Sequence, residues 1–441
     1  MSARSGGNSG HTLPTDALTR RNLLVRAGGG ALALSGAASI LAACGGGGSS
    51  DGGSSATSSG ASGGQGKGIG GIPIASKQHP VKLPIYDANQ AIKSGLDPEA
   101  GPLTVFDWGD YISPEVLKSF EKKYGVKAKL TTYADFQESL GKISSGAIKA
   151  DVWVPVVERI PQLVAAKLIQ PLNHDYIPNF ANVIPAMANP YYDQGSQYTM
   201  PNYIWTTGIL WRGDLLPDLD PQSESNPWDV FWTTQGIKGK LGLQNAEAFD
   251  PLSLGLLRNG VTDFPNTTKA QVDEATAKLK ELTANGAKFQ YTGFQPIANG
   301  TQVIAQAWNG DAFVAPGYLK KGTPAGAIRY WFPDDGVGAV NSDFWSIPKS
   351  AKNPVLGHLF INHLLEEQTA IENFKVVGYQ QPLKGLTAER FKELELGDPD
   401  LLDAVVVTEP DADKGLPNPT PSKDQLTWYE DAFASLTSGA S

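Results

Sequence analysis

The sequence is poor in cysteine, histidine and basic residues. Cys44 is the only cysteine among 441 residues, so a disulfide bond within the chain is excluded. Lys and Arg number 36 against 45 Asp and Glu, which gives a net charge of -9. This balance argues against nucleic acid or an anionic membrane surface as a partner, because both need basic patches. The histidines show no metal-ligand spacing, and zinc is not expected at His11, His79, His174, His358 or His363.

The motifs of common enzyme classes are also missing. The sequence has no nucleophile elbow in a strand-turn-helix context, no Cys–His pair, no phosphate loop and no H-E-x-x-H. Two glycine-rich matches, at 60–64 and 66–71, follow no strand and reflect composition alone. The chain is therefore predicted not to be an enzyme, and no cofactor or metal is expected.

The first hundred residues are predicted to lie outside the folded body. Residues 1–43 contain a twin-arginine pair, Arg20-Arg21, followed by a weakly apolar run, and indicate an export signal. Cys44 follows Leu41-Ala42-Ala43 and resembles the acylated cysteine of a bacterial lipobox. Residues 44–71 are a flexible Gly/Ser tether, and 72–101 an extended arm. We expect an exported lipoprotein, anchored at Cys44, in the periplasm or on the cell surface.

The folded part opens with alternating strands and helices. Residues 103–107 form a strand, and Ser113-Pro114 begin a helix that ends at Gly125. A strand over 126–132, a helix after Asp135, a strand over 150–155 and a helix around 160–164 follow. This β-α-β-α-β-α order predicts an α/β fold with a mainly parallel sheet and right-handed crossovers.

A second lobe with its own α/β order is predicted over 205–344, between two crossing segments near 199–206 and 341–348. Within it we expect strands over 240–243, 301–308 and 328–332 and a long helix capped by Thr268. The first lobe then comprises 102–204 and 345–441, the latter including an amphipathic C-terminal helix over 425–436. No internal repeat or coiled-coil heptad is present.

One combination of residues recurs where strands are predicted to end: an aromatic ring beside a carboxylate. Ligands of open α/β sheets bind at the carboxyl ends of strands. Aromatic faces and carboxylates together suit an organic cation, by cation–π contact and ion pairing. If the lobes face each other, these groups converge in one cleft, and they are Trp108, Asp110, Tyr111, Trp308, Asp311, Asp343 and Tyr379.

Over residues 103–385 the chain resembles the bacterial periplasmic spermidine/putrescine-binding proteins, the solute receptors of polyamine ABC importers. The resemblance rests on FDWGDYISPEVLKSFEKKYGVK, ADVWVP, MPNYIW, AWNGDAF, SDFWSIP and GYQQP. It implies a two-lobed, type II-like periplasmic-binding-protein fold that closes around its ligand. It also implies a membrane permease as partner, and we expect the receptor to be a monomer.

The same resemblance implies roles for individual residues. Trp108 and Tyr111 would stack on a putrescine- or spermidine-like ligand, and Asp110 would pair with one amine. Trp308, Asp311 and Asp343 would hold the other end, with Tyr379 contributing from the hinge side.

The chain departs from the family pattern after the third strand. A small hydroxyl residue and often a tyrosine are usual there, whereas this chain has Val156-Val157-Glu158. Val156 cannot donate a hydrogen bond, while Glu158 can either add a carboxylate to the site or lie on the surface. The acidic pair of the second lobe is matched only loosely, by Glu247 and Asp250.

Other readings stay open at this point. A receptor of the same fold for an amino-acid derivative or a sugar would use the same aromatic platforms with fewer carboxylates. A ferric-iron receptor could use Tyr191-Tyr192, although a packed loop is the simpler role for that pair. Paired carboxylates could serve glycoside hydrolysis, but Asp110 and Asp311 are predicted on opposing lobes, which suits a clamp better.

Overall fold

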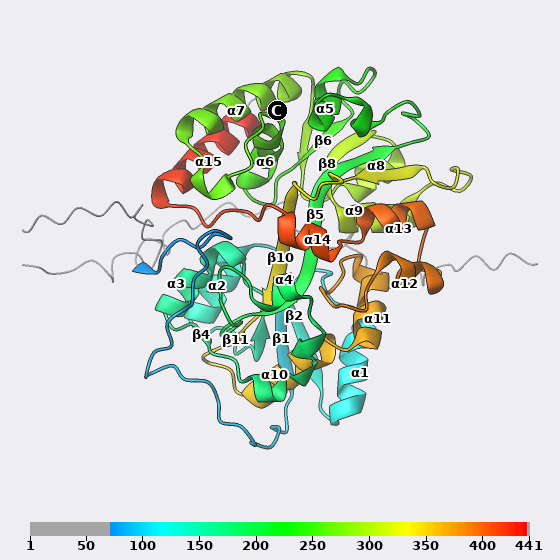
Figure 1. Ribbon diagram of the computed structural model, residues 1–441. Helices are drawn as coiled ribbons and strands as arrows, with labels where there is room; N and C mark the ends of the chain where they lie inside the picture. The colour runs from blue at the N-terminus through cyan, green and yellow to red at the C-terminus, as the bar shows by residue number, and fades with distance from the viewer. Residues whose placement is uncertain (1–70, 439–441) are drawn as a thin grey trace, which may run out of the picture. The chain divides into compact units, whose positions relative to one another are not determined.

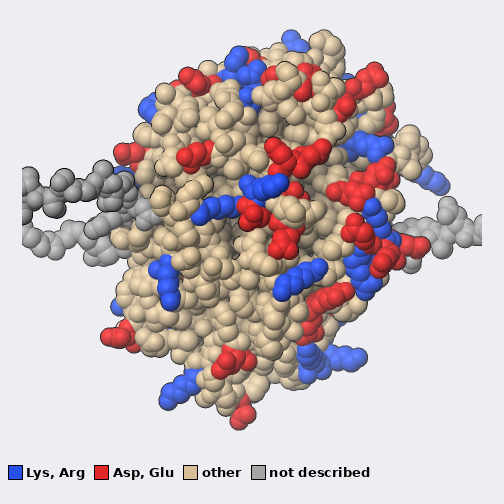
Figure 2. Space-filling view, in the orientation of Figure 1, with Lys and Arg blue, Asp and Glu red and all other residues tan. Residues whose placement is uncertain are grey.

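The computed structural model of the protein describes residues 71–438 (Figure 1). The twin-arginine segment, Cys44 and most of the tether predicted above lie outside the described residues. No helix in the described part is both long and apolar enough to cross a membrane. On the face seen in Figure 2, basic and acidic side chains are interspersed.

The first sheet is parallel and has the strand order β2-β1-β3. Its strands are β1 (Leu103–Trp108), β2 (Ala128–Tyr133) and β3 (Val152–Trp153). Its connecting helices are α1 (Pro114–Tyr124), α2 (Phe136–Ser144) and α3 (Ile160–Ala165). The predicted alternation and its parallel sheet are confirmed, although the third strand is shorter than 150–155.

The start of α1 follows the local rules predicted from the sequence. The Ser113 hydroxyl accepts a hydrogen bond from the backbone N–H of Glu115 (3.3 Å), and Pro114 occupies the first turn. At the other end Gly125 has φ +70° and donates to the carbonyl of Glu121 (2.9 Å). These caps fix the helix that follows the turn containing Trp108 and Tyr111.

The second sheet has six strands in the order β10-β5-β8-β6-β7, with β9 also paired to β5. Strand β6 is parallel to both β7 and β8, whereas β5 is antiparallel to β8, β9 and β10. The strands are β5 (Met200–Arg212), β6 (Leu241–Gln244), β7 (Lys288–Gln290), β8 (Ile304–Trp308), β9 (Ile328–Trp331) and β10 (Ala339–Trp345).

The two predicted crossing segments lie side by side. In the antiparallel pair of β5 and β10, Met200 stands opposite Trp345 and Pro201 opposite Phe344. The register shifts between Ser342 and Phe344, which places a bulge at Asp343. The bulge re-aims the Asp343 side chain at the point where the chain leaves the large sheet.

Helices α6 (Phe249–Arg258) and α7 (Lys269–Ala284) pack on the second sheet. Thr268 caps α7 as predicted, in a capping box with Gln271. The remaining helices and strands are β4 (Ile169–Gln170), α4 (Pro185–Ala188), α5 (Val230–Thr233), α8 (Phe294–Asn299), α9 (Asn309–Val314), β11 (Ile347–Pro348), α10 (Pro354–Leu364), α11 (Glu367–Val377), α12 (Ala388–Glu393), α13 (Pro399–Val405) and α14 (Glu409–Lys414).

The C-terminal helix α15 (Lys423–Thr437) forms as predicted but packs elsewhere than expected. Tyr429 lies against Phe249 of α6, with ring centroids 5.0 Å apart, and Gln425 donates to the carbonyl of Pro265 (2.9 Å). Figure 1 shows α15 beside α7, on the second sheet. This C-terminal helix, grouped above with lobe 1, makes its contacts with α6 and α7. Its apolar stripe completes the core between α6 and α7.

The arm over 72–101 contains no regular helix or strand among its described residues and runs along the body. Its apolar residues Ile72, Val81 and Leu83 are buried in the cluster around Trp153. The Lys77 ammonium donates to the carbonyls of Ala412 (3.1 Å), Asp413 (2.6 Å) and Gly415 (2.5 Å) at the end of α14. The arm is thus fastened both to the cluster around Trp153 and to the end of α14.

Candidate functional site

The first part of the site lies at the carboxyl end of β1. Trp108 is half-buried and packs on Tyr133, with centroids 4.7 Å apart. Asp110 is exposed and adopts φ +57°, the left-handed conformation that Asp tolerates better than most residues. The chain turns sharply at Asp110 and continues through Tyr111 into α1.

Tyr111 is held by a chain of buried hydrogen bonds. The Tyr203 hydroxyl donates to the carbonyl of Tyr111 (2.6 Å), and the Asn373 amide donates to the Tyr203 hydroxyl (2.5 Å). The other end of the Asn373 amide accepts from the backbone N–H of Ser113 (2.7 Å). These bonds fix the backbone at Tyr111 from β5 and α11, and the Tyr111 ring packs edge-to-face on the Tyr203 ring, with centroids 4.9 Å apart.

The Tyr111 hydroxyl donates a hydrogen bond to Asp343 Oδ2 (2.5 Å). Asp343 is buried, and burial raises the pKa of its carboxyl group to about 7, opposed by the bond from Tyr111. The structure therefore brings these two predicted residues together across 232 positions of sequence. Burial and the charge of Asp343 raise the pKa of Tyr111 well above its usual value, so its hydroxyl stays a donor.

Tyr379 packs against the aromatic side chains around Tyr111. Its ring lies 5.8 Å from that of Tyr111 and 6.5 Å from that of Trp205, measured between centroids. The ring also packs directly over Gly310, where a Cβ would stand 2.4 Å from the Tyr379 ring. This close contact with the Tyr379 ring requires a glycine at position 310 of the AWNGDAF stretch.

The second part of the site lies at the carboxyl ends of β6 and β8. In the amide orientation that satisfies its partners, the side-chain oxygen of Gln244 accepts from the backbone N–H (3.2 Å) and the indole N–H (3.0 Å) of Trp308. Gln244 ends β6 and Trp308 ends β8, so these bonds fix the indole at the shared edge of the sheet. Trp308 directly precedes α9, which begins at Asn309.

Asp250 is a buried carboxylate in the first turn of α6. Its Oδ2 accepts from the backbone N–H of Glu247 (2.7 Å), while burial and the charge of Glu247 raise its pKa to about 7. Glu247 is exposed as a whole residue, but the surroundings of its carboxyl group and the charge of Glu158 raise its pKa to about 7 as well. The two predicted acids of the second lobe therefore stand next to each other.

Glu158 connects the two groups of acids electrostatically. It lies in a single turn of 3-10 helix, Val157–Arg159, and is half-buried, as is Val156. Burial raises the pKa of Glu158 to about 7, and the charges of Asp250 and Asp343 add to this. Glu158 is therefore a partly buried acid whose charge is coupled to both groups of acids.

Asp311 is placed differently from its neighbours. It is 1% exposed, and its Oδ2 accepts from the backbone N–H of Gly293 (2.6 Å). Asp311 was predicted to pair with a ligand amine, but one of its carboxylate oxygens binds the backbone of the loop that precedes α8.

Several residues of the site were not predicted. Tyr203, Trp205 and Asn373 support the aromatic group, and the MPNYIW stretch already flagged two of them as part of a crossing. Asp107 is fully buried beneath Trp108, and burial raises its pKa well above the usual value. Tyr291 follows β7 and packs edge-to-face on Trp308 (5.8 Å between centroids, 80°). It was missed because β7 is only three residues long.

The tyrosine pair considered for iron is engaged in packing. Tyr191 and Tyr192 contact each other edge-to-face at 5.2 Å, and the Tyr192 hydroxyl lies 3.4 Å from Ser342 Oγ. Among the described residues, no group of three or more His, Cys, Asp or Glu is arranged to hold a metal ion.

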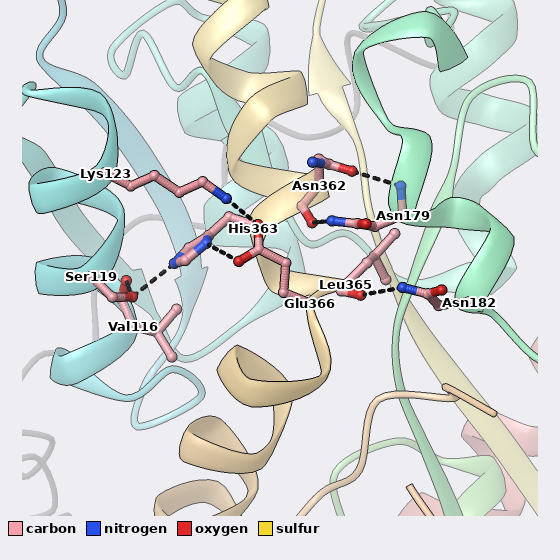
Figure 3. A network of polar contacts seen from close by, with 9 residues as sticks. All are labelled: Val116, Ser119, Lys123, Asn179, Asn182, Asn362, His363, Leu365 and Glu366. Carbon is pink, nitrogen blue, oxygen red and sulfur yellow. Dashed lines mark hydrogen bonds and ion pairs between the residues drawn. The ribbon is translucent and has the colours of Figure 1, made fainter. Parts of the chain in front are cut away.

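A second polar network, shown in Figure 3, fastens α1 to α10 and α11. His363 Nε2 lies 2.7 Å from Ser119 Oγ, and its Nδ1 lies 3.2 Å from Glu366 Oε2. The other carboxylate oxygen of Glu366, Oε1, pairs with Lys123. Ser119 donates its proton to the carbonyl of Val116 (2.9 Å), one turn earlier in its helix. The network ties α1 to the end of α10 and the start of α11.

Comparison with known proteins places this geometry in a family. A family model described as "Bacterial extracellular solute-binding protein" matches residues 115–393. The chain belongs to this family. The "Spermidine/putrescine-binding periplasmic protein" of Escherichia coli strain K12 is 30% identical over 284 residues, which cover 64% of this chain and 77% of the relative.

Two further comparisons agree with this assignment. The "Putrescine-binding periplasmic protein PotF" of the same strain is 26% identical over 313 residues, covering 69% of this chain and 84% of the relative. The crystal structure of the spermidine/putrescine ABC transporter substrate-binding protein PotD from Streptococcus pneumoniae superposes with a TM-score of 0.64 at 23% identity. It covers 77% of this chain and 99% of that chain, which confirms the predicted two-lobed α/β solute-binding fold.

Proposed function

We propose that this chain is the substrate-binding receptor of an ABC importer and that it binds a polyamine between its two lobes. The observation that carries the proposal is the set of three acids Glu158, Asp250 and Asp343, each with a pKa raised to about 7. Burying like charges together is unfavourable unless a cation offsets them. An organic ammonium group does so, and its methylene chain suits the aromatic rings nearby.

The roles of the site residues follow from their positions. Trp108, Tyr111, Trp308 and Tyr379 supply aromatic faces from both sheets. Asp343, Glu158, Asp250 and Glu247 supply charge, and the exposed Asp110 stands at the rim. Asp311 binds the backbone N–H of Gly293 and so positions the loop before α8 on the second lobe's side of the site.

Closure of the lobes is the expected mechanism. One lobe would be 102–204 with the chain from 345 up to the start of α15, and the other would be 205–344 together with α15. They would rotate about the paired strands β5 and β10. Ligand favours the closed state because only that state brings the carboxylates of both lobes within reach. The closed receptor would then dock on the permease as a monomer, held at the membrane by lipid on Cys44.

The relatives are named as binding proteins, and the site contains no activated nucleophile among its described residues. We therefore expect the ligand to be returned unchanged. Incubation of the full chain with spermidine, followed by denaturation and mass spectrometry of the released molecule, tests this. Recovery of one equivalent of intact spermidine supports a receptor, whereas a converted product would make the chain an enzyme.

A receptor for a different solute is the second candidate. Val156 favours it, because a valine offers no hydrogen bond where a hydroxyl residue is usual. Thermal unfolding of the full chain with putrescine, spermidine, 4-aminobutyrate, glucose and ferric citrate separates these cases. An increase in melting temperature with amines alone supports the first proposal, and an increase with another solute alone supports the second.

A further inference from the structure

The chain between α14 and α15, residues 415–422, forms a strap that Figure 1 shows running from one helix to the other. Proline occupies every second position in it, at Pro417, Pro419 and Pro421. Each proline fixes its own φ and restricts the preceding residue to extended conformations, so the strap is stiff for its length. It lies beyond residues 115–393, the part of the chain that the family model matches.

The strap pairs with the outer edge of β10. The Leu416 N–H donates to the carbonyl of Gly338 (2.8 Å), and the Leu416 carbonyl accepts from the N–H of Val340 (3.1 Å), as in a parallel bridge. The other edge of β10 is occupied by β5. Backbone groups of alternate residues in an extended chain point to opposite sides, so the prolines face away from β10. They lack an N–H, which leaves this edge of the large sheet poorly suited to further pairing.

Asn418 continues this pairing through a reciprocal contact with Asn341 of β10. The Asn418 N–H donates to Asn341 Oδ1 (2.7 Å), and the Asn341 amide donates to Asn418 Oδ1 (3.2 Å). In the β5–β10 pair, Asn341 stands opposite Trp205. The carbonyl of Asn418 also accepts a long hydrogen bond from the hydroxyl of Tyr191 in the first lobe (3.5 Å). The strap therefore contacts the two strands about which the lobes are proposed to rotate.

The two ends of the strap are anchored on different lobes. Before it, Ala412 of α14 packs with Ile184 of the first lobe in one apolar cluster. After it, Gln425 of α15 donates to the carbonyls of Pro265 (2.9 Å) and Thr267 (3.2 Å) in the second lobe. A stiff segment that is fixed at both ends and paired to the hinge between them limits how far the lobes can rotate.

The arrangement that the strap spans is one in which the aromatic groups of both lobes meet. Tyr111 of the first lobe and Trp308 of the second pack against the same buried cluster. We propose that the strap is a brace that holds the hinge in this arrangement through the pair of Asn341 and Asn418. None of the acids and rings of the candidate site belongs to the strap, so the brace acts on every ligand of the closed form by the same factor.

The first test measures the affinity and the dissociation rate of spermidine and of putrescine, by calorimetry and by stopped-flow tryptophan fluorescence, for the full chain and its variants. Asn418→Pro removes both the N–H and the side-chain amide but suits an extended strap. It should weaken binding of both amines by the same factor, about tenfold, mainly through faster dissociation. Asn418→Ala keeps the backbone bond and should weaken both about threefold.

Asn226→Ala is the matched control. The Asn226 side chain donates to the carbonyl of Arg258 (2.7 Å) and accepts from the N–H of Trp228 (3.1 Å), so this variant also loses two hydrogen bonds of an asparagine. These bonds lie within the second lobe, away from the hinge strands. Asn226→Ala should therefore lower stability and leave both affinities unchanged.

Hydrogen exchange of the ligand-free chain supplies a second readout that does not depend on the ligand. The backbone amides of β5 and β10 should exchange faster in Asn418→Pro than in the wild type, and at the wild-type rate in Asn226→Ala. If the wild type binds neither amine, the proposed polyamine function fails, and hydrogen exchange still decides on the brace. Unchanged exchange in these strands refutes the brace. Unchanged affinity for an amine that the wild type binds, or a loss confined to one amine, refutes it as well.

Discussion

Ligand binding should depend strongly on pH in the range where the acids of the site titrate. Asp343, Glu158 and Asp250 each have a pKa of about 7 in the ligand-free protein. Amines stay protonated to about pH 10, so only the protein side of the ion pairs titrates between pH 6 and 8. At pH 6 each acid is about 90% protonated and must lose its proton to pair with an ammonium group.

The size of the pH effect on affinity follows from the protonated fraction of each acid. Each acid that must ionise costs about tenfold in affinity at pH 6 relative to pH 8. One such acid gives a tenfold change, and three acting independently give about a thousandfold, which is an upper bound because their charges interact. At pH 7 each acid is half ionised, so binding should release between about 0.5 and 1.5 protons.

Calorimetry measures both quantities. Spermidine is titrated into the full chain at pH 6, 7 and 8, and at pH 7 in two buffers whose ionisation enthalpies differ, so that the released protons are counted. Asp343→Asn serves as the control, because it removes one titrating group and should flatten the pH profile. A dissociation constant that is the same at pH 6 and pH 8, with no protons released, would refute the reasoning.

The other predictions concern stability and supporting contacts. Because burial raises the pKa of Asp343 and Asp250, the stability that these two acids contribute in the ligand-free protein is full below about pH 4 and is lost as pH rises through 7. The melting temperature should therefore fall over that range, and added spermidine should reverse the fall. Gly310→Ala should displace the Tyr379 ring, destabilise the chain by about 1–3 kcal/mol in urea unfolding and weaken binding; unchanged binding would contradict the packing argument. Lys77→Met should lower the unfolding free energy by about 1 kcal/mol without altering affinity, since its carbonyl partners lie at the end of α14.

Local signals in the sequence were sufficient to predict the first sheet. Ser113-Pro114 and Gly125 mark both ends of α1, and the apolar spacing between them needs no tertiary information. The same holds for the capping box at Thr268. These features depend on residues within a few positions of each other, so the sequence carries them directly.

Long-range placement was harder to predict. The amphipathic pattern of α15 indicates that one face is buried but not against which lobe. The bond between Tyr111 and Asp343 joins distant segments, and the bulge that aims Asp343 has no local signature. Tyr291 follows a strand too short to show a periodicity, and the use of one Asp311 oxygen by Gly293 depends on how the loop before α8 folds back.

The central claim is that an organic polycation binds between aromatic rings and acids contributed by both sheets. Calorimetric titration of the full chain with putrescine, spermidine and a neutral sugar, repeated for Trp108→Ala, tests it most directly. Micromolar or tighter binding of an amine, no heat with the sugar, and loss of amine binding in Trp108→Ala are the predicted results. Binding of the sugar with no heat from either amine, in protein shown to be folded and free of bound ligand, would contradict the claim.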